Sequence, residues 1–253
     1  MADRDQMVSF MNDLLDADGY PDMLPVGLQV PGRQEVTRVA SGVSASLELF
    51  AQAAAGDVQM LLVHHGLFFG SGPRPPLRES DKARLRILFD HDISLVAYHL
   101  ALDAHPEVGN NAVICRLLGL GQPEPFGLVG QRTIGFIGTA AEPISLGSLV
   151  DRVREHITPA PLVFRDGPPD VRRVAVISGA ASGELWAAAD AGADCFITGE
   201  PREQVMAEAR EAGIHYIAAG HYATEVFGVR ALGDLLAERF SVEHAFIDIP
   251  NPV

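Results

Sequence analysis

The strongest constraint on the fold is that the chain repeats its own plan of apolar strands and amphipathic helices. Short apolar runs alternate with helical patterns along the sequence, which is typical of α/β proteins. The segment from Ser46 to Gly56 aligns without a gap with the segment from Ser182 to Gly192, and an apolar run follows each of them. We therefore predict an α/β fold made of two related α/β lobes.

A second correspondence supports the repeat. Each half carries a His-x-x-x-acid pattern directly after an apolar run, with His99 and Asp103 in the first half and His221 and Glu225 in the second. Alanine-rich helices can also match by chance. Taken by itself, the match of the Ser46–Gly56 and Ser182–Gly192 segments leaves this alternative open. Two correspondences in the same order favour two related lobes that face each other.

The segment 119–130 is rich in Gly and Pro and is the candidate domain boundary. It places the first lobe at residues 1–125, with the HHG and HxxxD segments, and the second at 126–253, with the TGE and HxxxE segments. Packing of the C-terminal segment back on the first lobe stays open.

Periodicity predicts where the elements lie. Helices are expected at residues 5–16, 46–55, 81–90, 106–118, 146–156, 184–191, 203–211 and 224–239. Strands are expected at residues 36–43, 58–64, 94–98, 132–138, 162–164, 171–177, 194–198, 214–218 and 245–249.

Charge and composition exclude several classes of protein. The chain has 33 acidic and 19 basic residues and a net charge of -14, so binding of extended nucleic acid through a basic face is unlikely. No apolar run reaches the roughly 18 residues of a membrane span. Cys115 and Cys195 are too few for a disulfide scaffold or a thiolate zinc site. These features predict a reduced cytoplasmic protein.

The first candidate metal ligands are His64 and His65, which close an apolar run and are followed by Gly66. Ligands usually bind at the carboxyl ends of strands in an open α/β sheet. Adjacent side chains of a regular strand point to opposite faces. Either the chain leaves strand geometry at Gly66, or only one of the two histidines faces the site.

The second set of candidates comes from the His-x-x-x-acid patterns. Asp103 and Glu225 also have a simpler interpretation as helix caps. Together with the histidines, however, they offer more imidazole and carboxylate groups than one tetrahedral ion needs. Mixed N and O ligands suit Zn, Mn, Fe or Co, so we predict a dinuclear site. Metal-bound water would then attack a carbonyl or phosphoryl group.

Other functional motifs are weak or absent. The turn 178–183 follows a strand and opens a helix, so it is either a phosphate cradle or, with better odds, a plain tight turn. The sequence contains no GxxxxGK[ST] phosphate loop and no GxSxG nucleophile elbow.

The motifs together resemble the NIF-three-like dinuclear metal-centre family, also called GTP cyclohydrolase I type two homologues. The resemblance covers the chain from about Gly27 to its end. It rests on the following segments: Gly27-Leu-Gln-Val30, Gly42-Val-Ser-Ala-Ser46, His64-His-Gly-Leu-Phe-Phe69, His99-Leu-Ala-Leu-Asp-Ala-His-Pro-Glu-Val-Gly-Asn-Asn111, Thr198-Gly-Glu200, Gly220-His-Tyr-Ala-Thr-Glu225 and Phe246-Ile-Asp-Ile-Pro-Asn-Pro-Val253.

The resemblance implies two α/β lobes with a dinuclear metal site in the cleft between them. It also implies a ligand set for two divalent transition metal ions per chain, Zn, Fe or Mn. The matching positions are His64, His65, Asp103, His221 and Glu225. It places His99 at the site in a supporting or proton-handling role, and we assign proton transfer to His99 and Glu200. It also implies a homo-oligomer, a hexameric ring.

Two functions follow as hypotheses. The first is a metal-dependent hydrolase of a small nucleotide-like or phosphorylated substrate, with GTP cyclohydrolase activity implied only by the family's name. The alternative is a non-enzymatic ring-forming scaffold or metal carrier, in which the dinuclear centre is structural.

Overall fold

The computed structural model describes residues 1–68 and 76–253, so Phe69 of the HHG motif lies outside the described residues. The chain divides into two compact units. Unit 1 comprises Met1–Leu102 and Gly228–Pro250, and unit 2 comprises Asp103–Phe227 and Asn251–Val253. Each unit is a mixed α/β structure with its own sheet and core, which confirms the predicted fold class.

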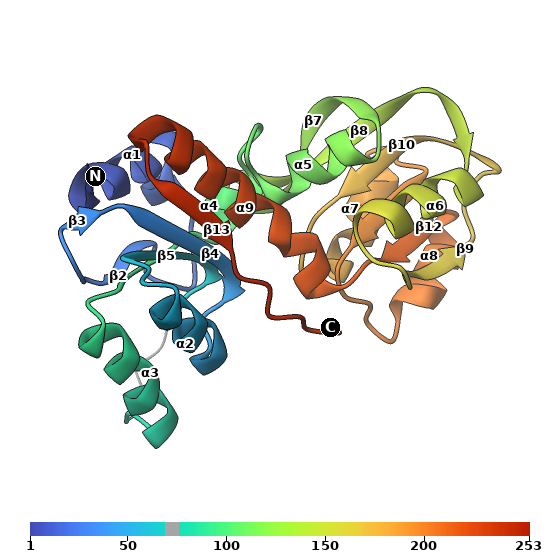
Figure 1. The fold of residues 1–253 in the computed structure, drawn as a ribbon. Helices are drawn as coiled ribbons and strands as arrows, with labels where there is room; N and C mark the ends of the chain where they lie inside the picture. The colour runs from blue at the N-terminus through green and yellow to red at the C-terminus, as the bar shows by residue number, and fades with distance from the viewer. Residues whose placement is uncertain (69–75) are drawn as a thin grey trace. The chain divides into compact units, whose positions relative to one another are not determined.

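Unit 1 begins with short elements and continues as an α/β sheet (Figure 1). Its strands are β1 (Ala2–Asp3), β2 (Gly27–Val30), β3 (Glu35–Val36), β4 (Arg38–Ser44), β5 (Met60–His65), β6 (Ser94–Ala97) and β13 (Glu243–Phe246). Its helices are α1 (Arg4–Leu15), η1 (Ala17–Gly19), α2 (Leu47–Ala55), α3 (Glu79–Asp90), most of α4 (Leu100–Asp103) and the second part of α9 (His221–Phe240).

The main sheet of unit 1 has the order β13-β4-β5-β6-β2. Helices α2 and α3 cover one of its faces, where Phe50 and Leu88 pack with Leu61 and Leu95. On the other side lie α1 and the second part of α9 (Figure 1), which meet through an edge-to-face contact of Phe10 with Phe240. Both faces of the sheet are therefore covered, which explains why the residues of β5 and β6 are almost all buried.

Unit 2 contains the remaining elements. Its strands are β7 (Leu120–Val129), β8 (Arg132–Ser145), β9 (Leu162–Arg165), β10 (Asp170–Val176), β11 (Cys195–Thr198) and β12 (His215–Ala218). Its helices are α5 (Asn110–Leu117), α6 (Leu146–His156), η2 (Ser182–Glu184), α7 (Leu185–Asp190), α8 (Val205–Ala212) and the first part of α9.

The sheet of unit 2 has the order β7-β8-β10-β11-β12-β9. Helices α5 and α6 bury Ile114 and Leu149 against one face of it, together with Val174 and Ile197. Cys115 and Cys195 are both free and buried.

The repeat seen in the sequence is present in the topology of the two units. Three parallel strands, β4-β5-β6 in unit 1 and β10-β11-β12 in unit 2, lie in chain order. In each unit an antiparallel strand that precedes them in the sequence, β2 or β9, borders the last of the three. The helices between equivalent strands are α2 and α7, then α3 and α8.

Two segments have a local structure that their sequence does not indicate. The candidate boundary segment 119–130 forms most of β7, so residue 125 lies inside a strand of unit 2. Proline is tolerated there because β7 is an edge strand, with one side of its backbone outside the ladder. The helix expected at residues 106–118 begins only at Asn110, after Gly109 in extended conformation.

Across residues 1–68 and 76–253, none of the helices combines the length and apolar character that a membrane span requires.

A polar array in unit 1 joins β13 to β4 and α9. The His244 imidazole lies 2.7 Å from an oxygen of Asp234 through Nδ1 and 2.8 Å from Ser41 Oγ through Nε2. The Asp234 carboxylate accepts a hydrogen bond from Nδ1, so the proton of the neutral ring lies on Nδ1. Nε2 of this ring then accepts from the Ser41 hydroxyl. The ring lies directly against Gly233, where an added Cβ would come within 2.1 Å of Nε2. Glycine at this position is therefore required by the close approach of the ring.

We predict that Gly233→Ala destabilises the protein. The helix-propensity gain of about 1 kcal/mol is smaller than the overpacking penalty of about 1–3 kcal/mol, so the free energy of unfolding in urea should fall. In a His244→Ala background the same change should be neutral or stabilising. Gly147→Ala in α6 is the matched control, because its nearest heavy atom lies at 3.6 Å. An equal loss in both backgrounds would contradict this account.

Candidate metal centre

The histidines of unit 1 form one group. His64 and His65 are the last two residues of β5, and His99 follows β6, the neighbouring parallel strand. One potential ligand atom from each of the three lies within 4.8 Å of the others. The ring centroids of His64 lie 4.9 Å from those of both His65 and His99. Both imidazoles of the HHG motif therefore serve the same group, although both residues belong to the strand.

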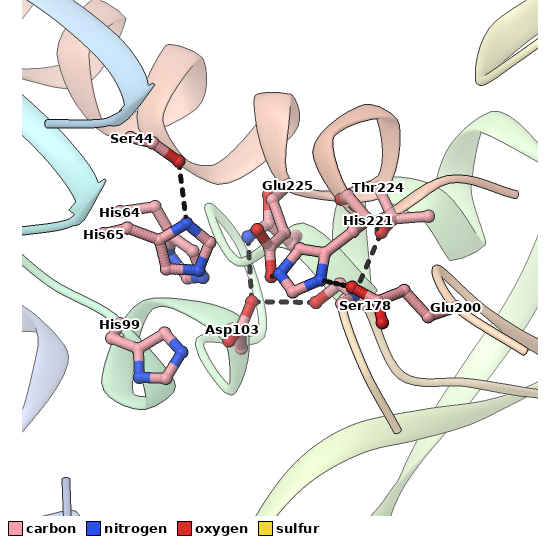
Figure 2. Close-up of polar contacts among 12 residues, drawn as sticks. Ser44, His64, His65, His99, Asp103, Ser178, Glu200, His221, Thr224 and Glu225 are labelled. Carbon is pink, nitrogen blue, oxygen red and sulfur yellow. Dashed lines mark hydrogen bonds and ion pairs between the residues drawn. The ribbon is translucent and has the colours of Figure 1, made fainter. Parts of the chain in front are cut away.

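Each ring of this group has a partner at Nδ1. His64 donates to the carbonyl oxygen of Tyr98 at 3.1 Å, and His65 Nδ1 lies 3.0 Å from Ser44 Oγ (Figure 2). His99 Nδ1 lies 3.0 Å from a carboxylate oxygen of Asp22. Metal-binding histidines typically engage one ring nitrogen in this way and present the other to the ion. For His64 and His99, whose Nδ1 partners are a carbonyl and a carboxylate oxygen, this leaves Nε2 as the candidate ligand atom. The Ser44 hydroxyl can donate to His65 Nδ1 or accept from it.

Asp22 is a residue that sequence reasoning missed. It lies between η1 and β2, in a segment without helical or strand periodicity, and its side chain is only 3% exposed. Burial acts to raise the pKa of Asp22, but the hydrogen bond and the charge of His99 and the backbone N–H groups of Leu100 and Met23 outweigh it and hold the pKa below its usual value. Asp22 is thus an ionised acceptor beside His99.

In unit 2, His221 and Glu225 occupy the first turns of α9 and face each other across one helical turn. His221 Nε2 lies 3.1 Å from a carboxylate oxygen of Glu225, whose side chain is 3% exposed. His221 Nδ1 is hydrogen-bonded to Glu200, which follows β11 (Figure 2). The two carboxylates raise the pKa of His221 to about 9, with Glu225 as the largest cause, against the opposing effect of burial.

Asp103 is held in a buried network of the same unit. One of its carboxylate oxygens accepts from Asn110 Nδ2 and from Ser178 Oγ, both at 2.8 Å. Asn111 donates to the carbonyl oxygens of Asp103 and Ile134, at 3.3 and 2.6 Å, and accepts from the backbone N–H of Ser178 at 2.7 Å. These amides explain the density of polar residues in the 99–111 segment better than a simple helix cap does.

The turn that follows Ser178 brings this network next to α9. Gly179 has a φ of +67°, and a Cβ at this position would come within 2.5 Å of Glu225 Oε1. Its N–H donates to Thr224 Oγ1, and the N–H of Ala181 donates to Thr198 Oγ1. Because hydroxyl groups of unit 2 already accept from these N–H groups, the structure favours the tight-turn interpretation of residues 178–183 over a phosphate cradle.

The other histidines have structural contacts. His215 accepts from the N–H of Gly167 and contacts the carbonyl oxygen of Pro168, and His105 accepts from backbone N–H groups of the following turn. The Ser41, His244 and Asp234 array has the order of a hydrolase triad, but Ser41 is 0% exposed. A nucleophile must reach its substrate, so this array is not a candidate active site.

The structure thus groups the predicted residues within each unit. In unit 1 it brings together His64, His65 and His99. In unit 2 it brings Glu200, His221 and Glu225 together and places Asp103 in the network around Ser178. Besides Asp22, sequence reasoning did not assign a role to Thr224, whose hydroxyl group accepts from Gly179, and it placed Ser178 in the 178–183 turn without predicting its contact with Asp103. No local periodicity or motif spacing identifies such partners.

The fold and the three-histidine group define the chain as an α/β protein with a candidate metal-binding site. It belongs to the Duf34/NIF3 (NGG1p interacting factor 3) family, whose pattern matches residues 2–252. This result confirms the resemblance stated from the motifs.

Relatives match the chain along nearly its whole length. A Pseudomonas aeruginosa protein named GTP cyclohydrolase 1 type 2 homolog is 46% identical over 238 residues, which cover 94% of each chain. A protein of the same name from Archaeoglobus fulgidus is 41% identical and covers 97% of this chain and 98% of its own.

Solved structures agree with the fold of this chain. The structure of TTHA1606 from Thermus thermophilus has a TM-score of 0.91 at 38% identity, with both chains fully covered. The structure of protein ybgI, described as of unknown function, has a TM-score of 0.92 at 37% identity and the same coverage.

We predict that Asn111→Ala lowers the free energy of unfolding by about 2–4 kcal/mol, because it leaves a buried N–H and buried carbonyl groups without their amide partner. Urea denaturation followed by circular dichroism measures the change. Arg154→Ala is the control, since its ion pair with Asp151 is exposed and should contribute at most about 1 kcal/mol. A similar small effect for both variants would show that Asn111 does not hold this network.

Proposed function

We propose that the chain binds two divalent transition metal ions, Zn, Fe or Mn, and acts as a hydrolase on a small nucleotide-like or phosphorylated substrate. The proposed metal ligands are His64, His65, Asp103, His221 and Glu225, and the proposed proton-handling residues are His99 and Glu200. The observation that carries this proposal is that every candidate histidine ligand has a partner at Nδ1 inside its own unit.

The chemistry of unit 1 fits a metal ion. Three imidazoles offer ligand atoms within 4.8 Å of one another, and His64 is fully buried. Neutral imidazole suits Zn, Fe and other late divalent ions. The carbonyl oxygen of Tyr98 accepts a hydrogen bond from His64 Nδ1. The proton of the neutral ring is therefore on Nδ1, and the lone pair is on Nε2.

The chemistry of unit 2 fits a cation as well. Asp103 and Glu225 are both buried carboxylates, and burying an ionised carboxylate is unfavourable unless positive charge or strong donors compensate for it. In the metal-free chain a proton shared by His221 Nε2 and Glu225 provides this compensation. The same two groups become available as ligands when that proton leaves.

When bound, a pair of such ions acidifies water and polarises a carbonyl or phosphoryl oxygen. The residues of this chain provide the rest. Glu200 keeps the Nδ1 proton of His221 in place and orients its ring. Its carboxylate is about one-third exposed, which lets it exchange protons with solvent or substrate. His99 is partly buried beside His64 and His65, where its ring can take up a proton at Nε2.

The substrate class rests on charge and on the names of relatives. A net charge of -14 repels a phosphorylated substrate overall, and locally bound cations would offset this repulsion at the site. Relatives are named GTP cyclohydrolase 1 type 2 homologs, and GTP is the first nucleotide to test. The predicted cytoplasmic location and hexameric assembly remain predictions.

A second candidate function is a ring-forming scaffold or metal carrier with a structural metal centre. The family description, NGG1p interacting factor 3, refers to a protein interaction and favours this alternative. A structural centre is coordinatively closed and contributes to folding, whereas a catalytic one keeps an open position. The two candidates therefore differ in what metal removal does to stability.

The first test is metal stoichiometry by elemental analysis of untagged protein. We expect close to two transition metal ions per chain in the parent protein and fewer in His64→Ala and in Glu225→Ala, because each change removes a proposed ligand. His156→Ala, which removes a histidine on the surface of α6, is the control and should retain both ions. A chain that stays free of metal after loading with Zn, Mn or Fe would overturn the proposal.

The second test separates the hydrolase from the scaffold. After chelation we expect a folded protein with a modestly lower Tm that no longer converts nucleotides or phosphorylated small molecules, with products followed by mass spectrometry. Reloading should restore turnover. Unfolding on chelation, together with the absence of turnover in the metal-loaded protein, would favour the scaffold instead.

A further inference from the structure

We propose that the outward face of α3 in unit 1 binds an acidic amphipathic helix of a partner protein. This face lines a hollow of about 530 Å³, and the described residues around the hollow belong to α3 or directly precede it. The face takes no part in the proposed metal chemistry. Its test is therefore independent of the metal centre.

The apolar part of this face is exposed. α3 packs beside α2 (Figure 1) and buries Leu88, which is 1% exposed, in the core of unit 1. The next residue, Phe89, is 60% exposed, and Leu77, just before the helix, is 68% exposed. Leu85 lies one turn before Phe89 and also lines the hollow. α3 thus carries a second apolar stripe besides the one that faces the core, and such exposed stripes mark interaction sites.

A row of basic side chains runs beside this stripe. Arg78, Lys82 and Arg86 recur at every fourth residue, so they lie on one side of the helix with about 5–6 Å between neighbouring Cβ atoms. The chain has 19 basic residues against 33 acidic ones, and Lys82 is its only lysine. The row is therefore a local exception to the acidic character of the chain.

These cations are weakly engaged within the chain. Lys82 Nζ lies 3.4 Å from a carboxylate oxygen of Glu79, and Arg86 Nε lies 3.5 Å from one of Asp90, with all four side chains largely exposed. Exposed pairs of this kind contribute little, so carboxylates of a partner can replace them. Arg78 makes no ion pair with any residue that the structure describes. The face keeps a net positive charge in a chain whose total is -14.

The pattern indicates the chemistry of the partner. The apolar stripe requires apolar side chains opposite it, and the basic row requires carboxylates that repeat with the same spacing. The backbone groups in the middle of α3 are hydrogen-bonded inside the helix, so this face cannot extend a partner strand. A second helix satisfies its own backbone and presents Leu and Glu side chains at the same i, i+4 spacing. Salt screens the charges of the rest of the chain beyond about 8 Å.

Two other occupants are less well matched to this face. Clusters that bind anionic lipid typically contain roughly four to eight basic residues, whereas this face has three, and the negative charge of the chain opposes approach to a broad anionic surface. In a symmetric pair of two copies, the same patch lies on both sides of the interface. Such a pair would set the two basic rows against each other.

The experiment measures the fluorescence anisotropy of a labelled synthetic peptide titrated with the full chain. The peptide has three heptads, with Leu on its apolar face and Glu on its polar face, and a second peptide carries Gln in place of Glu. The variants are Phe89→Ser and Arg78→Gln, which change exposed side chains. Met206→Ser in α8 and Arg154→Gln in α6 make the same kinds of change elsewhere on the surface and are the controls.

We expect saturable binding of the Glu peptide by the parent chain and about tenfold weaker binding of the Gln peptide. Phe89→Ser should weaken binding of the Glu peptide about tenfold, because it removes the apolar anchor. Arg78→Gln should weaken it about two- to fivefold and reduce its dependence on salt. Both controls should bind as the parent chain does, and Phe89→Ser should keep the metal content of the parent chain.

Three results would overturn the inference. Absence of saturable peptide binding, or equal binding by the parent chain and Phe89→Ser, would show that this face does not receive an acidic helix. Self-association that Phe89→Ser abolishes would identify a second copy as the occupant. Sedimentation with phosphatidylserine vesicles that Phe89→Ser abolishes would identify a lipid surface instead. A parent chain without metal would bear only on the proposed function.

Discussion

The orientation of each imidazole by a partner at Nδ1 is the interaction on which the candidate site depends. An imidazole can offer a lone pair at Nε2 only when its proton is held elsewhere. The Nδ1 atom of His64 contacts the carbonyl oxygen of Tyr98, and that of His99 contacts the Asp22 carboxylate. The Nδ1 atom of His221 contacts the Glu200 carboxylate. Tyr98 and Glu200 lie just beyond the carboxyl ends of the parallel strands β6 and β11, whereas Asp22 lies in the loop before β2. The sheets thus determine the site through the ends of their strands.

The sequence could predict those parts of the site that depend on local pattern. His64 and His65 are recognisable because an apolar run ends there, and His221 and Glu225 because of their helical spacing. Asp22 was not predictable, since its contact with His99 joins residues 77 apart in the chain across a loop without periodicity. The same holds for Ser41 and His244, whose contact spans 203 residues. Partners of this kind are fixed only by tertiary packing.

The main errors in the predicted fold also have physical causes. Gly and Pro in 119–130 indicate a loop by local preference, yet the segment pairs with β8 as an edge strand, where proline interrupts few hydrogen bonds. Pro106 suggests the first turn of a helix, but residues 106–109 form a separate turn, and α5 begins only after Gly109. There the Asn110 and Asn111 amides bind around Asp103, and their contacts set where α5 begins.

The two His-x-x-x-acid patterns have the same spacing but different local structures. In α9 the helix continues beyond His221, so Glu225 returns to the ring of its own histidine. In the first pattern α4 ends at Asp103, whose carboxylate is bound by Asn110 and Ser178 instead. Unit 1 therefore presents imidazoles, and unit 2 presents carboxylates with one imidazole. Because imidazole and carboxylate favour different divalent ions, the two copies of the pattern offer two unlike sets of candidate ligands.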